Sequence, residues 1–127
     1  MKSKISNEDK SFSLTPTVFN ILVVLSGGER HGYAILREVE EIAKGKSRLG
    51  PTTLYRSIRT MLESGLIEEL GERPDPQMDD ERRRYYRLTG FGSRVLNEEV
   101  EKLEGLLKVA RGNSILSGNR RTANAEH

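Results

Sequence analysis

Two arginines and two threonines are grouped in the segment GPTTLYRSIRTMLESGLIEEL, residues 50–70. Arg56 and Arg59 are about one helical turn apart, so a helix presents both guanidinium groups on one face. A guanidinium group binds guanine edges or phosphate oxygens through parallel N–H donors. Thr52 and Thr53 bring hydroxyls and backbone N–H groups to the first turn, where phosphates bind. The segment therefore favours binding to a nucleic acid, with a merely solvated charged face as the alternative.

A helix over residues 51–64 is needed to hold these side chains together, and the apolar residues predict one. On a wheel of 100° per residue, four apolar side chains fall within one arc of about 100°: Leu54, Ile58, Met61 and Leu62. Tyr55 lies at the margin, where its hydroxyl can reach a phosphate while its ring packs inward. Gly65 is placed to end the helix in the left-handed conformation.

Two further helices are predicted before this segment. The first begins with Thr15 as N-cap and Pro16 at the first helical position, and Gly27-Gly28 ends its apolar run. The second runs from about Gly32 to Lys44 and ends at Gly45. Its predicted core stripe consists of Ile35, Leu36, Val39, Ile42 and Ala43. We expect His31 to cap or pack at the start of this helix, and we assign Tyr33, Leu66 and Tyr86 to the core.

A β-hairpin is predicted after Gly65, with strands at Leu66–Gly71 and Arg82–Leu88 around the polar tip ERPDPQMDDE. The pleat of the return strand sends Arg83 to the face opposite Arg82 and Arg84. At least one of these arginines is therefore expected to be available for DNA. The alternative is that they form cross-strand ion pairs with the acids of the partner strand, Glu68, Glu69 and Glu72.

A long helix is predicted from its cap at Thr89 to about Arg111. Its apolar residues step by four, three, four and three positions, which indicates a heptad seam for a second copy of the chain: Leu96, Val100, Leu103, Leu107 and Ala110. The predicted domain organisation is a flexible arm at 1–13, a DNA-binding domain at 14–88, a dimerisation helix at 89–112 and a flexible tail at 113–127.

The charges occur in blocks. From Lys44 to Thr60 there are five positive residues and no acid, and from Glu63 to Glu81 there are eight acids and one arginine. Lys46 and Arg48 belong to the positive block and are candidate phosphate contacts.

The composition limits the other functions. The chain has 127 residues, which suits one domain, and it has no cysteine and two histidines. No nucleophile–base set can be assembled, so we expect no enzyme activity, no catalytic residues, no metal site and no cofactor. We interpret Asp79, Asp80 and Glu81 as a charged turn. The longest apolar run has five residues, Ile21–Leu25, against about 20 for a membrane span. A cytoplasmic location is expected.

The predicted fold class is mostly α with a small hairpin wing: a winged helix-turn-helix followed by a long C-terminal dimerisation helix. Three segments also resemble the PadR family of transcriptional regulators: LTPTVFNILVVLSGGERHGYAI, GPTTLYRSIRTMLESGLIEE and RRRYYRLTGFGSRVL. The likeness covers about residues 14–111. The single C-terminal helix is similar to that of the short subgroup of the family.

The resemblance implies a dimeric DNA-binding protein, usually a repressor and often released from DNA by a small molecule, whose identity is unknown here. We expect a homodimer that binds a pseudo-palindromic operator in double-stranded DNA. Its reading helix corresponds to 51–64, with Thr52, Thr53, Tyr55, Arg56 and Arg59 at the contacting places. The chain has no tryptophan, unlike members that bind flat drugs between subunits. The alternative is a winged-helix protein–protein module that uses the same arginines on an acidic partner.

Overall fold

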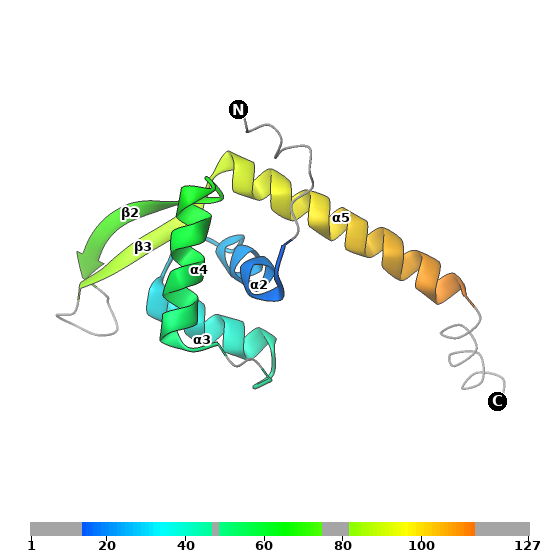
Figure 1. Cartoon of the computed structure of the whole chain (residues 1–127), viewed down its shortest axis with the longest axis horizontal. Coiled ribbons are helices and arrows are strands. Elements are labelled where there is room, and N and C mark those ends of the chain that lie inside the picture. The colour runs from blue at the N-terminus through cyan, green and yellow to red at the C-terminus, as the bar shows by residue number, and fades with distance from the viewer. Residues whose placement is uncertain (1–13, 47–48, 75–81, 114–127) are drawn as a thin grey trace. The chain divides into compact units, whose positions relative to one another are not determined.

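A computed structural model describes residues 14–46, 49–74 and 82–113, with the side chains of Pro74 and Arg82 left aside. In chain order the described elements are α2 (Pro16–Leu25), β1 (Arg30–His31), α3 (Gly32–Ile42), α4 (Pro51–Glu63), β2 (Ile67–Pro74), β3 (Arg82–Leu88) and α5 (Gly90–Gly112) (Figure 1). The predicted fold class is confirmed. The predicted arm at 1–13, nearly all of the tail and the acidic tip of the hairpin lie outside the described residues.

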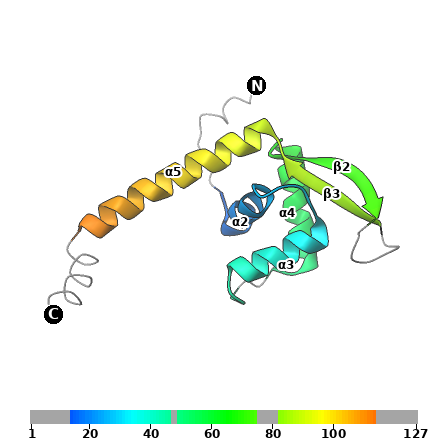
Figure 2. The same cartoon turned by 180° about the vertical axis from the view of Figure 1, so that it is seen from behind.

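The chain divides into two compact units between Leu96 and Asn97. In the first unit, α2 packs against α3, α4 and β3, and α4 packs against α3 and β2. Both views show α4 beside the hairpin (Figure 2). The core side chains come from every helix of this unit; those that are fully buried include Ile21, Leu22, Ile35, Leu54, Ile58 and Met61.

The two N-terminal helices begin at side-chain caps. The Thr15 hydroxyl accepts a hydrogen bond from the Val18 N–H at 3.1 Å, and Pro16 follows it, as predicted. His31 Nδ1 accepts from the Ala34 N–H at 3.1 Å, so the capping role expected of this histidine is confirmed.

Helix α3 begins at Gly32, as predicted, but it ends early and two of its side chains are more exposed than predicted. It ends at Ile42, two residues early, because Lys44 and Gly45 take positive φ angles of 55° and 79°. Ile42 is 46% exposed and does not join the core stripe. Tyr33 is 44% exposed, so its core assignment was wrong: its ring lies beside Arg37 and Arg83 rather than under the helices.

The sheet has three antiparallel strands in the order β1-β3-β2. The prediction missed β1, a strand of two residues, in which Arg30 is opposite Tyr86 and His31 is opposite Tyr85. The hairpin pairs from Ile67 with Leu88 to Pro74 with Arg82, and a bulge interrupts the register between Glu69 and Gly71. Strand β2 therefore extends three residues beyond its predicted end. Tyr86 and Leu66 are buried, as predicted.

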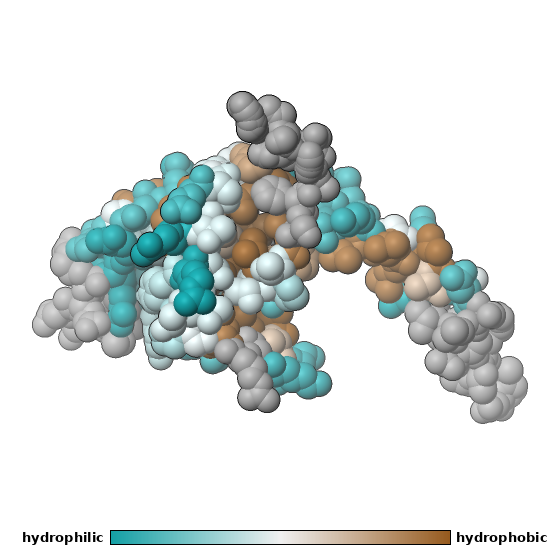
Figure 3. Space-filling model, in the orientation of Figure 1, coloured by the Kyte–Doolittle hydropathy of each residue, from teal (hydrophilic) through white to brown (hydrophobic). Residues whose placement is uncertain are grey.

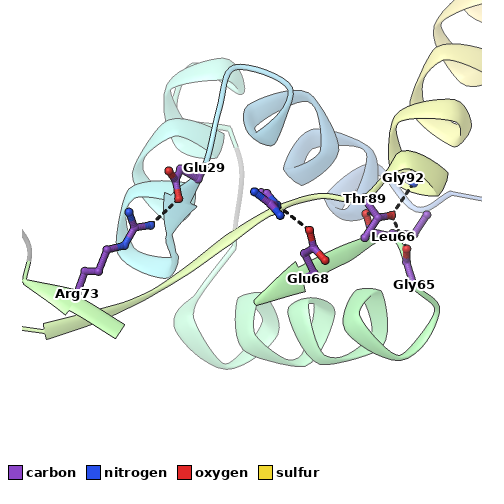
Figure 4. Close-up of polar contacts among 8 residues, drawn as sticks. Glu29, Gly65, Leu66, Glu68, Arg73, Thr89 and Gly92 are labelled. Atoms are coloured by element: carbon purple, nitrogen blue, oxygen red, sulfur yellow. Dashed lines mark hydrogen bonds and ion pairs between the residues drawn. The ribbon is translucent and has the colours of Figure 1, made fainter. Parts of the chain in front are cut away.

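Helix α5 is fixed to the turn after α4 by a short set of contacts (Figure 4). The Thr89 hydroxyl donates to the Gly65 carbonyl oxygen at 2.6 Å and accepts from the Gly92 N–H at 2.9 Å. The Thr89 N–H donates to the Leu66 carbonyl oxygen at 3.1 Å. Gly92 is buried directly against that carbonyl, where a Cβ atom would overlap the oxygen and lie 3.0 Å from the carbon. Thr89 is the cap that the sequence predicted, and Gly92 permits the close approach.

The second unit contains the remaining turns of α5. Apolar side chains are exposed along it, and Figure 3 shows them grouped on this segment; those with large exposed fractions are Leu103, Leu106, Leu107 and Val109. No helix in the described part of the chain is long and apolar enough to cross a membrane.

Candidate nucleic-acid interface

Helix α4 has one buried face and one exposed polar face, as its sequence predicts. Leu54, Ile58 and Met61 are buried. The candidate contacts Thr52, Thr53, Tyr55, Arg56 and Arg59 are all exposed. Pro51, Thr52, Tyr55, Arg56 and Arg59 line a shallow recess of about 510 Å³ along this face. The helix therefore presents hydroxyls and two cations together, with its apolar side holding it against the core.

Arg56 and Arg59 differ from the other arginines near them in their surroundings. Among the described residues, neither guanidinium group forms an ion pair or a hydrogen bond. Hydrophilic side chains gather over α4 and the hairpin in Figure 3. Two exposed cations that pair with no acid among the described residues are suited to bind anionic oxygens.

The wing arginines are placed differently from one another. Arg84 lies between two acids of β2, with its guanidinium 3.3 Å from Glu69 and 3.4 Å from Glu72. Those carboxylates, Glu69 first, raise the pKa of Arg84. The guanidinium of Arg83 lies 5.5 Å from the centre of the Tyr33 ring. The cross-strand ion pairs that were the alternative for this strand are thus present at Arg84.

Two more arginines of the hairpin are held by acids. Arg87 Nε lies 2.6 Å from Glu68, and Arg73 pairs with Glu29 in the turn before β1 (Figure 4). Of the remaining candidates, Lys46 is exposed after α3. Arg48 and the side chain of Arg82 lie outside the described part of the structure.

A group of aromatic rings and cations at the start of α3 was not predicted. The Tyr33 ring lies 5.3 Å from the Arg37 guanidinium, and the Tyr85 ring lies 4.0 Å from that of Arg73. His31 meets Tyr85 edge to face at 5.3 Å between ring centres. The pairing of β1 with β3 brings His31 to Tyr85, and a strand of two residues leaves no periodic pattern in the sequence from which it could be found.

A second recess, of about 350 Å³, lies between α4 and the wing. It is lined by Gly32, Tyr55, Glu72, Arg83, Arg84 and Tyr86. Tyr55 lines both this recess and the one along α4. No group of acids and histidines suited to a metal ion occurs among the residues that the structure describes.

Burial raises the pKa of the Tyr86 phenol above its ordinary value of 10.0; Glu69 and Tyr55 add to the rise and Arg84 opposes it. A raised pKa means that the fold favours the neutral phenol. This stabilisation is complete below the unfolded pKa and is lost as pH rises through the folded pKa. We expect the free energy of unfolding to fall above about pH 10, and to fall less in Tyr86→Phe. Urea unfolding at about pH 8 and about pH 11 measures both, and equal losses in the two proteins would exclude Tyr86 as the group responsible.

Three packed helices, the last with an exposed cationic face, followed by a hairpin, define a winged helix-turn-helix, a DNA-binding fold of transcription regulators. The chain belongs to the PadR-like family of transcriptional regulators, because the model of that family matches residues 21–98.

Several solved structures, two of them of transcription regulators, are similar to this chain. A PadR family regulator from Clostridium difficile R20291 is 26% identical with a TM-score of 0.62, over 75% of this chain and 94% of that one. A regulator from Clostridium thermocellum is 26% identical with a TM-score of 0.59, over 74% and 88%. RosR of H. salinarum is 26% identical with a TM-score of 0.60, over 92% and 96%. A search of curated proteins gave no significant match.

Proposed function

We propose that this chain is a repressor that binds a pseudo-palindromic operator in double-stranded DNA as a homodimer. The observation that carries the proposal is the face of α4, where Arg56 and Arg59 are exposed and have no acidic partner among the described residues. The two copies of α4 enter successive major grooves, with half-sites about 34–36 Å apart. Repression follows from occlusion of the promoter, in the cytoplasm.

The proposed contacts divide into base reading and phosphate binding. Arg56 and Arg59 read base edges, since arginine pairs with guanine through two hydrogen bonds. Phosphates are bound by the first turn of α4, by the loop before it and by the wing; the residues proposed for this role are Thr52, Thr53, Tyr55, Lys46, Arg48, Arg82, Arg83 and Arg84. Arg84 contributes least, because Glu69 and Glu72 already offset its charge.

The proposed dimer interface is the heptad seam of α5. Leu103 and Leu107 are 41% and 46% exposed in one chain, and Val100 and Ala110 are partly exposed on the same stripe. Burying such a stripe against a second copy removes apolar surface from water. Leu96, the first seam residue, is already buried within the first unit, so it contributes to the interface by supporting the start of the helix. No small-molecule effector is assigned to this interface.

Alanine substitutions on α4 test this function. In Arg56→Ala and in Arg59→Ala we expect a loss of about 1–3 kcal/mol in binding to a DNA site selected by the wild-type protein. Arg94→Ala removes the same charge from α5, where the guanidinium lies 6.0 Å from the Phe91 ring, and is the control for net charge. Fluorescence anisotropy on the selected duplex and on a scrambled duplex measures the affinities. Unchanged affinity in both α4 variants would remove this helix from recognition, and equal binding to the two duplexes would favour an acidic protein partner.

A further inference from the structure

Gly32 is the first residue of α3, and its backbone does not require glycine. The glycines with positive φ angles among the described residues are Gly28, Gly45, Gly65 and Gly71. Glycine is also a poorer helix former than alanine, because it loses more backbone freedom on folding. The reason for a glycine at position 32 must therefore be sought in what lies next to it.

The neighbour of Gly32 is the Tyr55 ring of α4. A Cβ atom on Gly32 would overlap the Tyr55 hydroxyl oxygen and lie 2.8 Å from Cζ and 2.9 Å from Cε1 of the ring. Real Cβ atoms do not come this close to other heavy atoms, so the ring and a larger residue cannot keep these positions together. Gly32 is buried although the ring above it is 49% exposed.

A larger residue at position 32 is expected to displace the Tyr55 ring and to leave the helices of the fold in place. The overlapping atoms belong to the far end of a side chain with an open path to solvent, so the ring can swing outward while both helices stay in place. Gly92 is the opposite case, since a Cβ atom there meets the backbone of Leu66. A Cβ atom added at Gly32 therefore displaces a side chain, whereas one added at Gly92 displaces backbone.

We propose that Gly32 is a positioning residue for DNA binding, whose lack of a side chain seats the Tyr55 ring across the start of α3. Tyr55 lines both the recess along α4 and the recess between α4 and the wing. This seating of the ring sets where the Tyr55 hydroxyl stands relative to Arg56, one residue later on the same helix. The inference rests on the proposed function, because it takes Tyr55 as a phosphate contact.

A double-mutant cycle tests the proposal. The variants are Gly32→Ala, Tyr55→Ala and both together, and the control is Gly90→Ala, which adds a methyl group to the first residue of another helix where nothing lies within 4 Å. We expect Gly32→Ala to weaken binding to the selected duplex about tenfold, as loss of a hydrogen bond to a charged group does. In the Tyr55→Ala background, Gly32→Ala causes no further loss. Equal losses in both backgrounds would overturn the proposal.

If Gly32→Ala does not fold, thermal unfolding of the double variant tests the proposal instead. Removal of the ring by Tyr55→Ala then restores the fold of the double variant, because the three heavy atoms nearest to the added Cβ atom all belong to the Tyr55 side chain. A double variant that stays unfolded would contradict the proposal, since it would place the clash elsewhere.

A separate readout does not depend on DNA. Fluorotyrosine is incorporated into the protein, and the ¹⁹F resonance of Tyr55 is assigned by its loss in Tyr55→Phe. We expect Gly32→Ala to move this resonance and Gly90→Ala to leave it in place. If the wild-type protein binds no DNA, the proposed function fails while this shift still supports the seating of the ring; an unmoved resonance would overturn the seating itself.

Discussion

Gly92→Ala is expected to lower the free energy of unfolding by about 3 kcal/mol, the upper end of overpacking effects. The added Cβ atom overlaps the Leu66 carbonyl oxygen, which belongs to the backbone of the turn after α4 and cannot swing aside. Relief requires the first turn of α5 to move. That movement also lengthens the hydrogen bond from the Gly92 N–H to the Thr89 hydroxyl. Thermal and urea unfolding followed by circular dichroism measure the loss.

Gly90→Ala is the matched control for this prediction. It adds the same atom two residues earlier in the same turn, where nothing lies within 4 Å. We expect its stability to equal or slightly exceed that of the wild type, because alanine favours the helix. Equal stability of the two variants would mean that α5 does not meet the turn at Leu66 as described.

Leu103→Asp is expected to convert the proposed dimer into a monomer at micromolar concentration. Leu103 lies in the middle of the proposed seam, so a carboxylate there is buried without a partner when two copies associate. A penalty of about 3–5 kcal/mol for an unpaired buried charge raises the dissociation constant by at least about 100-fold. Sedimentation equilibrium measures the change directly.

Val109→Asp is the control for Leu103→Asp, because it places the same charge on α5 outside the proposed seam. Val109 is 61% exposed, and on a helical wheel it lies about 120° from Leu103. The same change of charge at this position should leave the dimer intact. A monomer in both variants would point to a general loss of helix, and a dimer in both would place the interface outside the seam.

The helices were predictable because each carries local signals. Thr15-Pro16, His31 and Thr89 mark starts through caps that depend on adjacent residues, and the exposed face of α4 follows from helical geometry alone. The candidate contact residues within that face could also be chosen without tertiary information. The candidate residues of α4 are all where the spacing puts them.

The errors arose where distant segments meet. Strand β1 exists only through its pairing with β3, and this pairing brings Tyr33 beside Arg83 instead of into the core. The bulge after Glu69 changes which acids of β2 face Arg84. The contact of Gly32 with Tyr55 joins residues 23 positions apart. Such contacts depend on how elements dock, and the periodicity within one element carries no information about them.

Selection of bound sequences from a random pool of double-stranded DNA by the wild-type protein tests the central claim most directly. We expect one enriched sequence with two inverted half-sites whose centres are about 10–10.5 base pairs apart, one for each copy of α4. We also expect its affinity to fall steeply with salt, because each neutralised phosphate releases counterions. No enrichment, or a single site without an inverted second half, would contradict a homodimer that reads DNA through α4.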